Sequence, residues 1–205
     1  MMNGSNALAA LVVSLAVMAP ASTALTAPKT QLSMQTGNVT SQPIGHYEFC
    51  RDHRDECSIR TRSGSSARVT AHGWEVVRDI NLSVNTTIAP MTDMEIYGRE
   101  EVWAYPVDAG DCEDFVLLKR RKLMDAGFSP ADLLITVVRK PDGEGHAVLT
   151  LRTAQGDFIL DNLVDEVKLW TDTPYTYLKR QASFDTGRWV TIENGTTDVM
   201  VGALK

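Results

Sequence analysis

The chain has 205 residues, of which 43% are hydrophobic and 22% are charged, a composition that is ordinary for one globular domain. Its net charge of -6 and its lack of a basic block argue against nucleic acid as a partner. No second long apolar run follows the N-terminal region, so we expect a mature protein that does not span a membrane.

The N-terminus carries an apolar run at residues 7–18 that only Ser14 interrupts, followed by small residues. This pattern is typical of a signal peptide, which we place at residues 1–24, and it predicts a periplasmic or secreted protein. The run is too short to span a bilayer, which takes roughly 20 residues; a buried N-terminal helix is the alternative. Residues 25–42 are rich in Thr, Ser, Gln and Pro and are predicted to be a flexible lead-in.

Three cysteines follow the predicted signal peptide. Cys50 and Cys57 lie close together in the sequence, whereas Cys112 stands alone. In an oxidising compartment this arrangement predicts one disulfide, Cys50 to Cys57, and one free thiol. A zinc site made of Cys50, His53 and Cys57 is the alternative, but it supplies only three ligands at an unusual spacing. A solitary thiol outside the cytoplasm indicates a functional role for Cys112.

Two helices are predicted from apolar periodicity, at residues 69–87 and 111–126. The second has an apolar stripe and a basic run at residues 119–122, which we expect in solvent, and Gly127 ends it. Cys112 lies in its first turn, where unpaired backbone N–H groups and the helix dipole favour a thiolate. A small buried core residue would also suit this position.

Three strands are then predicted, at residues 133–139, 146–152 and 157–161. A turn near Ala154 would bring His146, which opens the second strand, beside Asp161, which closes the third. Directly opposed residues share a face of the sheet, but one residue of slip would separate the pair. A carboxylate next to an imidazole fixes its tautomer. Cys112, His146 and Asp161 are therefore the candidate catalytic triad.

Three acidic residues surround the thiol: Asp111, Glu113 and Asp114. Negative charges at this place raise the pKa of a thiol that should ionise. Either the carboxylates point away as helix caps, or they bind a hard cation such as Ca²⁺, whose charge would cancel the penalty.

The remaining candidates are weaker. Three further histidines have no acidic partner at a telling spacing and are expected at the surface: His46, His53 and His72. Trp103 either lines the acyl site or helps to form the oxyanion hole, or it packs in the core beneath the active helix. Asn162 either holds Asp161 or forms a turn.

Four segments occur together in this chain: Trp103-Ala104-Tyr105-Pro106, Gly110-Asp111-Cys112-Glu113-Asp114-Phe115, Gly145-His146-Ala147-Val148-Leu149 and Leu160-Asp161-Asn162-Leu163. In this combination they resemble the bacterial transglutaminase-like cysteine proteinases, a family that includes the LapG-type periplasmic proteases. The resemblance implies an α+β, papain-like transglutaminase core. In such a fold, helices carrying the Cys pack on an antiparallel sheet that carries the His and the Asp. We place this domain at residues 43–195 and a poorly ordered tail at residues 196–205.

The resemblance also implies chemistry. It assigns catalysis to Cys112, His146 and Asp161, and Ca²⁺ binding to Asp111 and Glu113, with Asp114 as a further candidate ligand. It implies a cysteine endopeptidase acting on a protein or peptide such as a surface adhesin, with an inner-membrane regulatory receptor as a partner. A transglutaminase or glutamine deamidase would use the same triad, and a non-catalytic binding module is the third alternative.

Overall fold

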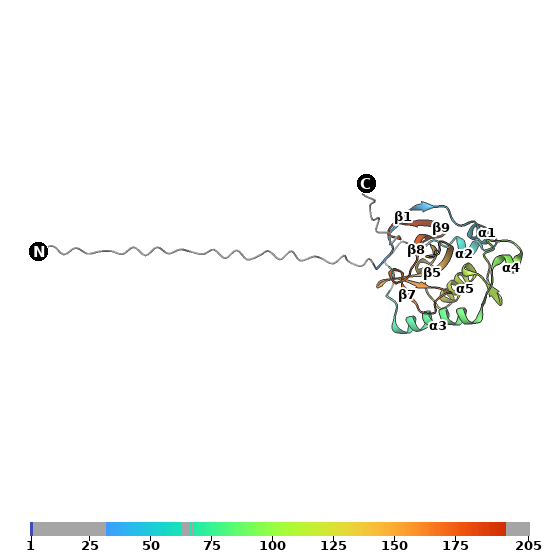
Figure 1. Ribbon diagram of the computed structural model, residues 1–205, viewed down its shortest axis with the longest axis horizontal. Helices are drawn as coiled ribbons and strands as arrows, with labels where there is room; N and C mark the ends of the chain where they lie inside the picture. Colours follow the sequence, from blue (N-terminus) through green and yellow to red (C-terminus); the bar gives the residue numbers. More distant parts are fainter. Residues whose placement is uncertain (2–31, 63–65, 67, 196–205) are drawn as a thin grey trace. The chain divides into compact units, whose positions relative to one another are not determined.

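The structure is a computed structural model that describes Met1 and residues 32–62, 66 and 68–195 (Figure 1). The expected signal peptide, apart from Met1, and the expected tail at residues 196–205 lie outside the described residues. Within the described part of the chain, no helix is long and apolar enough to cross a membrane.

The sheet has seven strands in the order β1-β9-β8-β4-β5-β6-β7, and each neighbouring pair is antiparallel. Its strands are β1 (Thr36–Thr40), β4 (Leu133–Arg139), β5 (Gly145–Thr153), β6 (Gly156–Leu160), β7 (Lys168–Leu169), β8 (Thr176–Ala182) and β9 (Asp185–Ile192). Two short strands, β2 (Ala89–Pro90) and β3 (Ala109–Gly110), pair in parallel apart from it. The three predicted strands are confirmed as β4, β5 and β6, and their bounds differ by one residue at most.

Strand β1 corrects the expected lead-in at residues 25–42, because that segment contains a strand of the sheet. The backbone of β1 pairs with β9, with Thr40 opposite Trp189. Just before it, the backbone N–H of Met34 donates to the buried carboxylate of Asp157. The polar composition of the segment reflects an edge strand with one exposed side, which period-two patterning does not reveal over five residues.

The helices are α1 (Ile44–Asp52), α2 (Arg54–Cys57), α3 (Ala71–Thr87), α4 (Asp93–Tyr97) and α5 (Cys112–Asp125), with 3-10 turns η1 (Pro130–Asp132) and η2 (Trp170–Asp172). Both predicted helices are confirmed as α3 and α5. Thr70 caps α3 by accepting from the backbone N–H of Gly73, and Gly127 follows α5 with φ 93°. Helix α5 packs between α3 and the sheet (Figure 1). The expected α+β fold, with helices on an antiparallel sheet, is thus confirmed.

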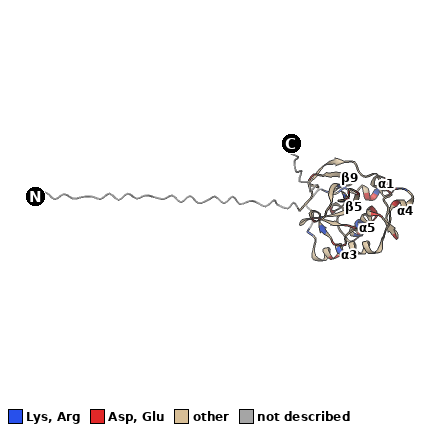
Figure 2. Cartoon of the chain, viewed as in Figure 1, with Lys and Arg blue, Asp and Glu red and all other residues tan. Residues whose placement is uncertain are grey.

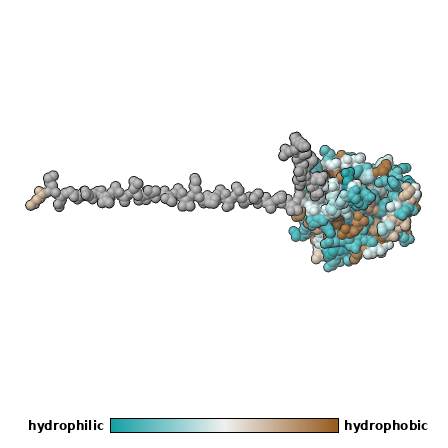
Figure 3. Space-filling model, in the orientation of Figure 1, coloured by the Kyte–Doolittle hydropathy of each residue, from teal (hydrophilic) through white to brown (hydrophobic). Residues whose placement is uncertain are grey.

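The core occupies both faces of the sheet. Along β5, Ala147, Leu149 and Leu151 face the cluster that includes α5, whereas Val148 belongs to a second cluster with Tyr177. This is the alternation expected of a strand. The outer face seen in Figure 3 is mostly hydrophilic with separate hydrophobic patches.

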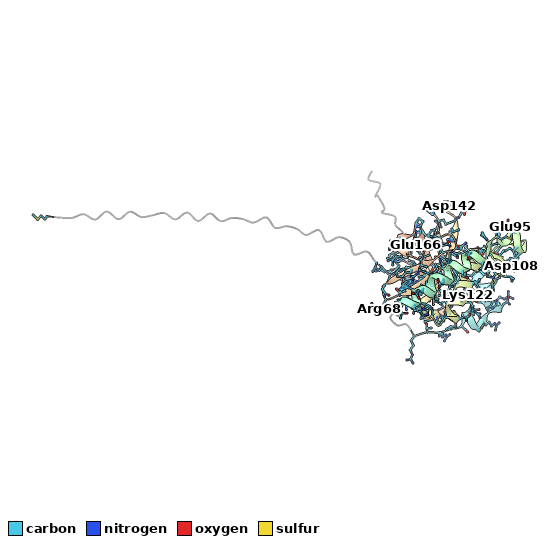
Figure 4. The ribbon with its side chains drawn as sticks, turned by 90° about the horizontal axis from the view of Figure 1, so that it is seen from below. Arg68, Glu95, Asp108, Lys122, Asp142 and Glu166 are labelled. Atoms are coloured by element: carbon cyan, nitrogen blue, oxygen red, sulfur yellow. A yellow bond between two sulfur atoms is a disulfide. The ribbon has the colours of Figure 1, made fainter. Side chains whose placement is uncertain are left out.

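The basic run of α5 is not uniformly solvated, so the expectation for residues 119–122 is wrong in part. Lys119 and Arg120 are buried, at 0% and 2% exposure, while Lys122 is exposed and labelled in Figure 4. Neighbouring elements cover α5 on more than one side, so two of its four basic positions face protein. Arg120 donates from Nε to the carbonyl of Leu133 and lies 3.6 Å from Glu56.

His46 also differs from the surface position expected for it. It is buried between Trp103 and Trp189, its Nδ1 accepts from the indole N–H of Trp189 at 3.2 Å, and its Nε2 lies 3.1 Å from the amide nitrogen of Gln181. Burial, with a smaller effect of the nearby charge of Arg120, lowers the pKa of His46 to about 3, so the ring is neutral. This environment combines residues from distant parts of the chain.

His72 is exposed as expected, whereas His53 is half-buried and stacks on Phe49 at 4.3 Å between ring centroids.

The structure joins Cys50 and Cys57 by a disulfide, which connects α1 to α2. Among the described residues, the histidine grouped with these two sulfurs is His46, not His53. The pair thus forms the disulfide of the first alternative rather than the zinc site of the second.

Glu56 supports the position of α5 from α2, because its buried carboxylate accepts from Tyr105 and Arg121 and faces Arg120. We expect Glu56→Gln to lower the free energy of unfolding by about 3 kcal/mol, since it leaves the buried Arg120 charge without its counter-charge. Urea denaturation followed by tryptophan fluorescence measures the loss.

Glu75→Gln is the matched control, because Glu75 pairs with His72 where both side chains are exposed. It should change the free energy of unfolding by no more than about 0.5 kcal/mol. Equal effects of the two substitutions would contradict the role given to Glu56.

Candidate active site

His146 and Asp161 form a buried hydrogen-bonded pair. Nε2 of His146 lies 2.9 Å from Oδ1 of Asp161. In the β5–β6 register, Leu160 lies opposite Leu149. If the same register is extended by one residue, Asp161 lies opposite Val148, which is two residues along β5 from His146. The pair is therefore diagonal rather than directly opposed. The turn after Thr153 shifts the register by two residues, which keeps both side chains on one face.

Two further groups fix the Asp161 carboxylate. The hydroxyl of Tyr175 donates to Oδ2, and the backbone N–H of Leu163 donates to Oδ1 at 3.0 Å. Burial opposes ionisation, but hydrogen bonds from His146, Tyr175 and Leu163 outweigh it and hold the pKa of Asp161 below its usual value. Asp161 is thus a fixed anion that accepts from His146.

Tyr175 was not found from the sequence, because no local spacing relates it to Asp161. Of the two roles considered for Asn162, the structure favours the turn. Within the described residues, the Asn162 side chain makes no hydrogen bond to Asp161, and the hydrogen bond from the Leu163 backbone to the Asp161 carboxylate closes the turn.

Cys112 is the first residue of α5, and its sulfur lies at the backbone N–H of Ala147, the residue after His146. Its thiol donates to Oε2 of Glu113 at 2.8 Å. Burial, followed by the charge and hydrogen bond of Glu113, raises the pKa of the Cys112 thiol well above its ordinary value. The sulfur thus lies next to the residue after His146, and His146 in turn bonds Asp161. The thiol itself bonds to Glu113, and no hydrogen bond between Cys112 and His146 is found in the described part of the chain.

A cleft of about 550 Å³ opens at this place. Its walls include residues from several elements: Ile44, Glu101, Trp103, Glu113, His146 and Lys179. Trp103 is 6% exposed and packs so closely on α1 that a Cβ at Gly45 would lie 2.2 Å from its Cδ1. Trp103 therefore packs in the core and also forms part of the cleft wall, so it combines two of the positions considered for it from the sequence.

A cluster of three carboxylates lies at the start of α5. Asp93, Asp111 and Asp114 each place one oxygen within 4.8 Å of the others (Figure 2 shows acidic residues at α4 and α5). Gly110 permits this approach, since a Cβ there would lie 2.7 Å from Cβ of Asp114. Each of the three residues has a buried carboxylate oxygen without a hydrogen-bond partner among the described residues. Clustered oxygen ligands of this kind suit a hard divalent cation.

The electrostatics of the cluster are unfavourable without a cation. Burial raises the pKa of Asp111 to about 9 and that of Asp114 to about 7, and neighbouring carboxylates add to both shifts. Burial also raises the pKa of Asp93. Three anions cannot be held together here at neutral pH unless a proton or a cation separates them.

The same carboxylates hold one wall of the cleft. Oδ2 of Asp93 accepts from the backbone N–H of Val102, and Oδ1 of Asp114 accepts from that of Ala104 at 2.8 Å. Trp103 lies between these two attachment points, so the acidic cluster fixes its position.

The grouping of the acids differs from the set Asp111, Glu113 and Asp114 expected from the sequence. Asp111 and Asp114 group with Asp93, whereas Glu113 contacts the thiol and helps to raise the pKa of Asp111. Asp111 makes no side-chain cap bond to its own helix, so capping does not account for it. Asp93 was missed because it lies in a different helix, α4, and no local spacing relates it to the start of α5.

A family model described as bacterial transglutaminase-like cysteine proteinase BTLCP matches residues 36–197. The chain belongs to this family. It is accordingly a cysteine peptidase by class, and the resemblance noted in its sequence is confirmed.

Solved structures of LapG from Legionella pneumophila are similar to this chain. The calcium-bound structure has a TM-score of 0.49 and 23% identity over 62% of this chain and 75% of LapG. A second structure has a TM-score of 0.48 and 25% identity over 57% and 68%, and an EGTA-treated one has 0.49 and 22% over 61% and 69%. A search of curated proteins found no match.

The raised pKa values predict that the metal-free protein loses stability as pH rises. A carboxyl whose pKa is higher in the folded than in the unfolded state stabilises the fold fully below its ordinary pKa of about 4. That contribution is lost as pH passes about 7 for Asp114 and about 9 for Asp111. Thermal denaturation in EDTA should therefore show a Tm that falls between about pH 5 and about pH 9.

Asp111→Asn should make the Tm of the metal-free protein depend less on pH, because it removes one of the buried carboxyl groups that must ionise as pH rises. Asp108→Asn is the control, since Asp108 is an exposed acid close in sequence and outside the cluster (Figure 4). An unchanged slope for Asp111→Asn would contradict the prediction.

Proposed function

We propose that this chain is an exported cysteine endopeptidase that transfers an acyl group to water, with Cys112 as nucleophile, His146 as base and Asp161 as the orienting group. The observation that carries the proposal is the buried His146–Asp161 hydrogen bond of 2.9 Å, located one residue from the backbone that contacts the Cys112 sulfur. Family membership supports the same chemistry.

The mechanism follows from the tautomer. Asp161 accepts a hydrogen bond from Nε2–H of His146, so the proton stays on Nε2 and Nδ1 is the basic nitrogen. Nδ1 takes the proton of Cys112, the thiolate attacks the amide carbonyl, and His146 then gives this proton to the departing amine. Water hydrolyses the thioester with His146 again as base. The backbone N–H of Cys112, at the start of α5, is the candidate donor to the oxyanion.

Glu113 sets a condition on the first step. The Glu113 carboxylate accepts a hydrogen bond from the Cys112 thiol, so this hydrogen bond must break before Nδ1 of His146 can take the thiol proton. A thiolate beside an ionised Glu113 is also repelled by it.

Ca²⁺ is the proposed cation, and Asp93, Asp111 and Asp114 are the residues that would hold it. The support is the oxygen-only donor set and the buried oxygens without partners among the described residues. When bound, the ion supplies positive charge that offsets the carboxylates next to Cys112. Glu113 remains a candidate further ligand because its charge helps to raise the pKa of Asp111.

The proposal also covers the location of the protein outside the cytoplasm and the class of its substrate. The apolar run in residues 1–24 has the pattern of a signal peptide, and a Cys50–Cys57 disulfide suits an oxidising compartment. A periplasmic or secreted peptidase would act on a protein substrate such as a surface adhesin, and an inner-membrane receptor is the proposed regulatory partner.

Cys112→Ala should abolish cleavage of a protein substrate, with a loss of at least about 10³-fold, because no other group supplies the nucleophile. His146→Ala should have a similar effect. Cys112→Ala should keep the Tm nearly unchanged, whereas His146→Ala should lower it, because it removes a buried hydrogen bond to Asp161. Asp142→Asn, an exposed change near the β4–β5 turn, serves as the control (Figure 4). Gel assays of cleavage together with differential scanning calorimetry test this.

Full activity of Cys112→Ala would refute the proposed nucleophile. Incubation of the wild-type chain with casein and a labelled primary amine separates the alternatives: incorporated label would indicate transglutaminase activity rather than hydrolysis.

Calorimetric titration of EDTA-stripped protein with Ca²⁺ should give saturable binding. Asp93→Asn and Asp111→Asn should each weaken it by at least about tenfold, since each removes a charged ligand. Bound Ca²⁺ should also speed alkylation of Cys112 by iodoacetamide, a readout of thiolate formation that needs no substrate. Absence of heat at millimolar Ca²⁺ would contradict the assignment, and Asp108→Asn should bind like the wild type.

A further inference from the structure

The loop that carries Asp161 is fixed to α3 at both of its ends. Asn85 donates from Nδ2 to the carbonyl of Asp161 at 2.9 Å, and Asn81 donates to the carbonyl of Asp165 at 2.8 Å. Asn85 also donates to the Asp165 carboxylate at 2.9 Å. The two asparagines are one helical turn apart and therefore lie on the same side of α3.

This attachment matters because Asp161 lies just beyond the last residue of β6, Leu160. The ladder of sheet hydrogen bonds fixes His146 within β5, but it ends before Asp161. The carbonyl held by Asn85 and the carboxylate that meets His146 belong to the same residue. Fixing this carbonyl therefore restricts the direction of the side chain.

Lys119 of α5 lies close enough to the same loop for the charges of Asp161 and Asp165 to act on it. It is fully buried, and its Nζ has no hydrogen-bond acceptor within the described part of the chain, although it lies 5.9 Å from the centroid of the Phe115 ring. Burial lowers the pKa of Lys119 to about 7, and the charges of Asp161 and Asp165 act in the opposite direction. By reciprocity, an ammonium at this place favours an ionised Asp161.

We propose that Asn85, assisted by Asn81, is a positioning residue that aims the Asp161 carboxylate at His146, so that α3 takes part in organising the reaction. The inference rests on the proposed function, because it assigns a role within the proposed triad. Neither asparagine lines the cleft, so the effect must pass through Asp161.

The test uses Asn85→Leu and Asn85→Asp, two side chains with the same number of heavy atoms and the same branching as Asn, neither of which can donate to the Asp161 carbonyl at neutral pH. We expect each to lower kcat by about 10-fold to 100-fold with little change in KM, as small misplacements of reacting groups do. In protein labelled with ¹⁵N-histidine, the downfield Nε2–H resonance of His146 should shift and exchange faster with water.

Two controls separate positioning from general loss of structure. Asp165→Asn replaces the exposed side-chain acceptor but keeps both loop carbonyls, so kcat should stay within twofold of the wild type. Thr87→Ala lies at the same end of α3 and removes a hydroxyl that bonds within its own helix, to Ser83. It should leave both kcat and the resonance unchanged.

A wild-type kcat and an unchanged His146 resonance in Asn85→Asp would overturn the proposal, as would an equal loss of kcat in Thr87→Ala. If Asn85→Leu does not fold, Asn85→Asp alone decides. The resonance reports the His146–Asp161 bond without turnover. Activity retained in Cys112→Ala would therefore refute the proposed function while leaving the positioning of Asp161 measurable.

Discussion

The crowding of carboxylates at the start of α5 is the constraint on which the rest of this site depends. Asp93, Asp111 and Asp114 lie within 4.8 Å of one another, and Glu113 connects them to the thiol of Cys112. Part of their charge is offset by the N-terminal end of the helix dipole, worth at most about 1 to 2 kcal/mol. That is too little to keep several buried anions together, so the cluster must take up protons or a cation. At a given pH, the number of protons or cations that the cluster holds therefore depends on the cation concentration in solution as well as on the fold.

The cluster connects two features that a peptidase needs together. Through Asp111, it begins the helix that carries Cys112. Through the backbone N–H groups of Val102 and Ala104, it holds the segment that places Trp103 in the wall of the cleft. A change in the charge of the cluster therefore acts on the proposed nucleophile and on the wall of the cleft at once. This coupling needs no movement of distant parts, since the contacts are direct.

The parts of the site that the sequence predicted are those that local periodicity determines. Helix α5 and the β5–β6 hairpin follow from apolar spacing and turn residues, and the hairpin brought His146 and Asp161 together even though its register differs by two residues from the one expected. The positions of Asp93, Glu113, Tyr175, Lys119 and His46 could not be predicted in this way. Each depends on which segments meet in space. Lys119 and His46 also contradict the average preference of their residue types for solvent, because neighbouring elements cover them.

The three proposed catalytic side chains differ in how many contacts fix them, and this difference indicates which side chain must move before reaction. His146 lies within a paired strand, and Asp161 is fixed by His146, Tyr175, Leu163 and Asn85. Moving either would break several buried hydrogen bonds at a cost of about 1 kcal/mol or more each. Among the described residues, the thiol of Cys112 has one side-chain partner, Glu113, and a staggered rotation about its Cα–Cβ bond changes that contact and the one with the backbone of Ala147. Activation is therefore cheapest as a movement of sulfur toward a fixed imidazole, and the charge on Glu113 determines how readily that movement occurs.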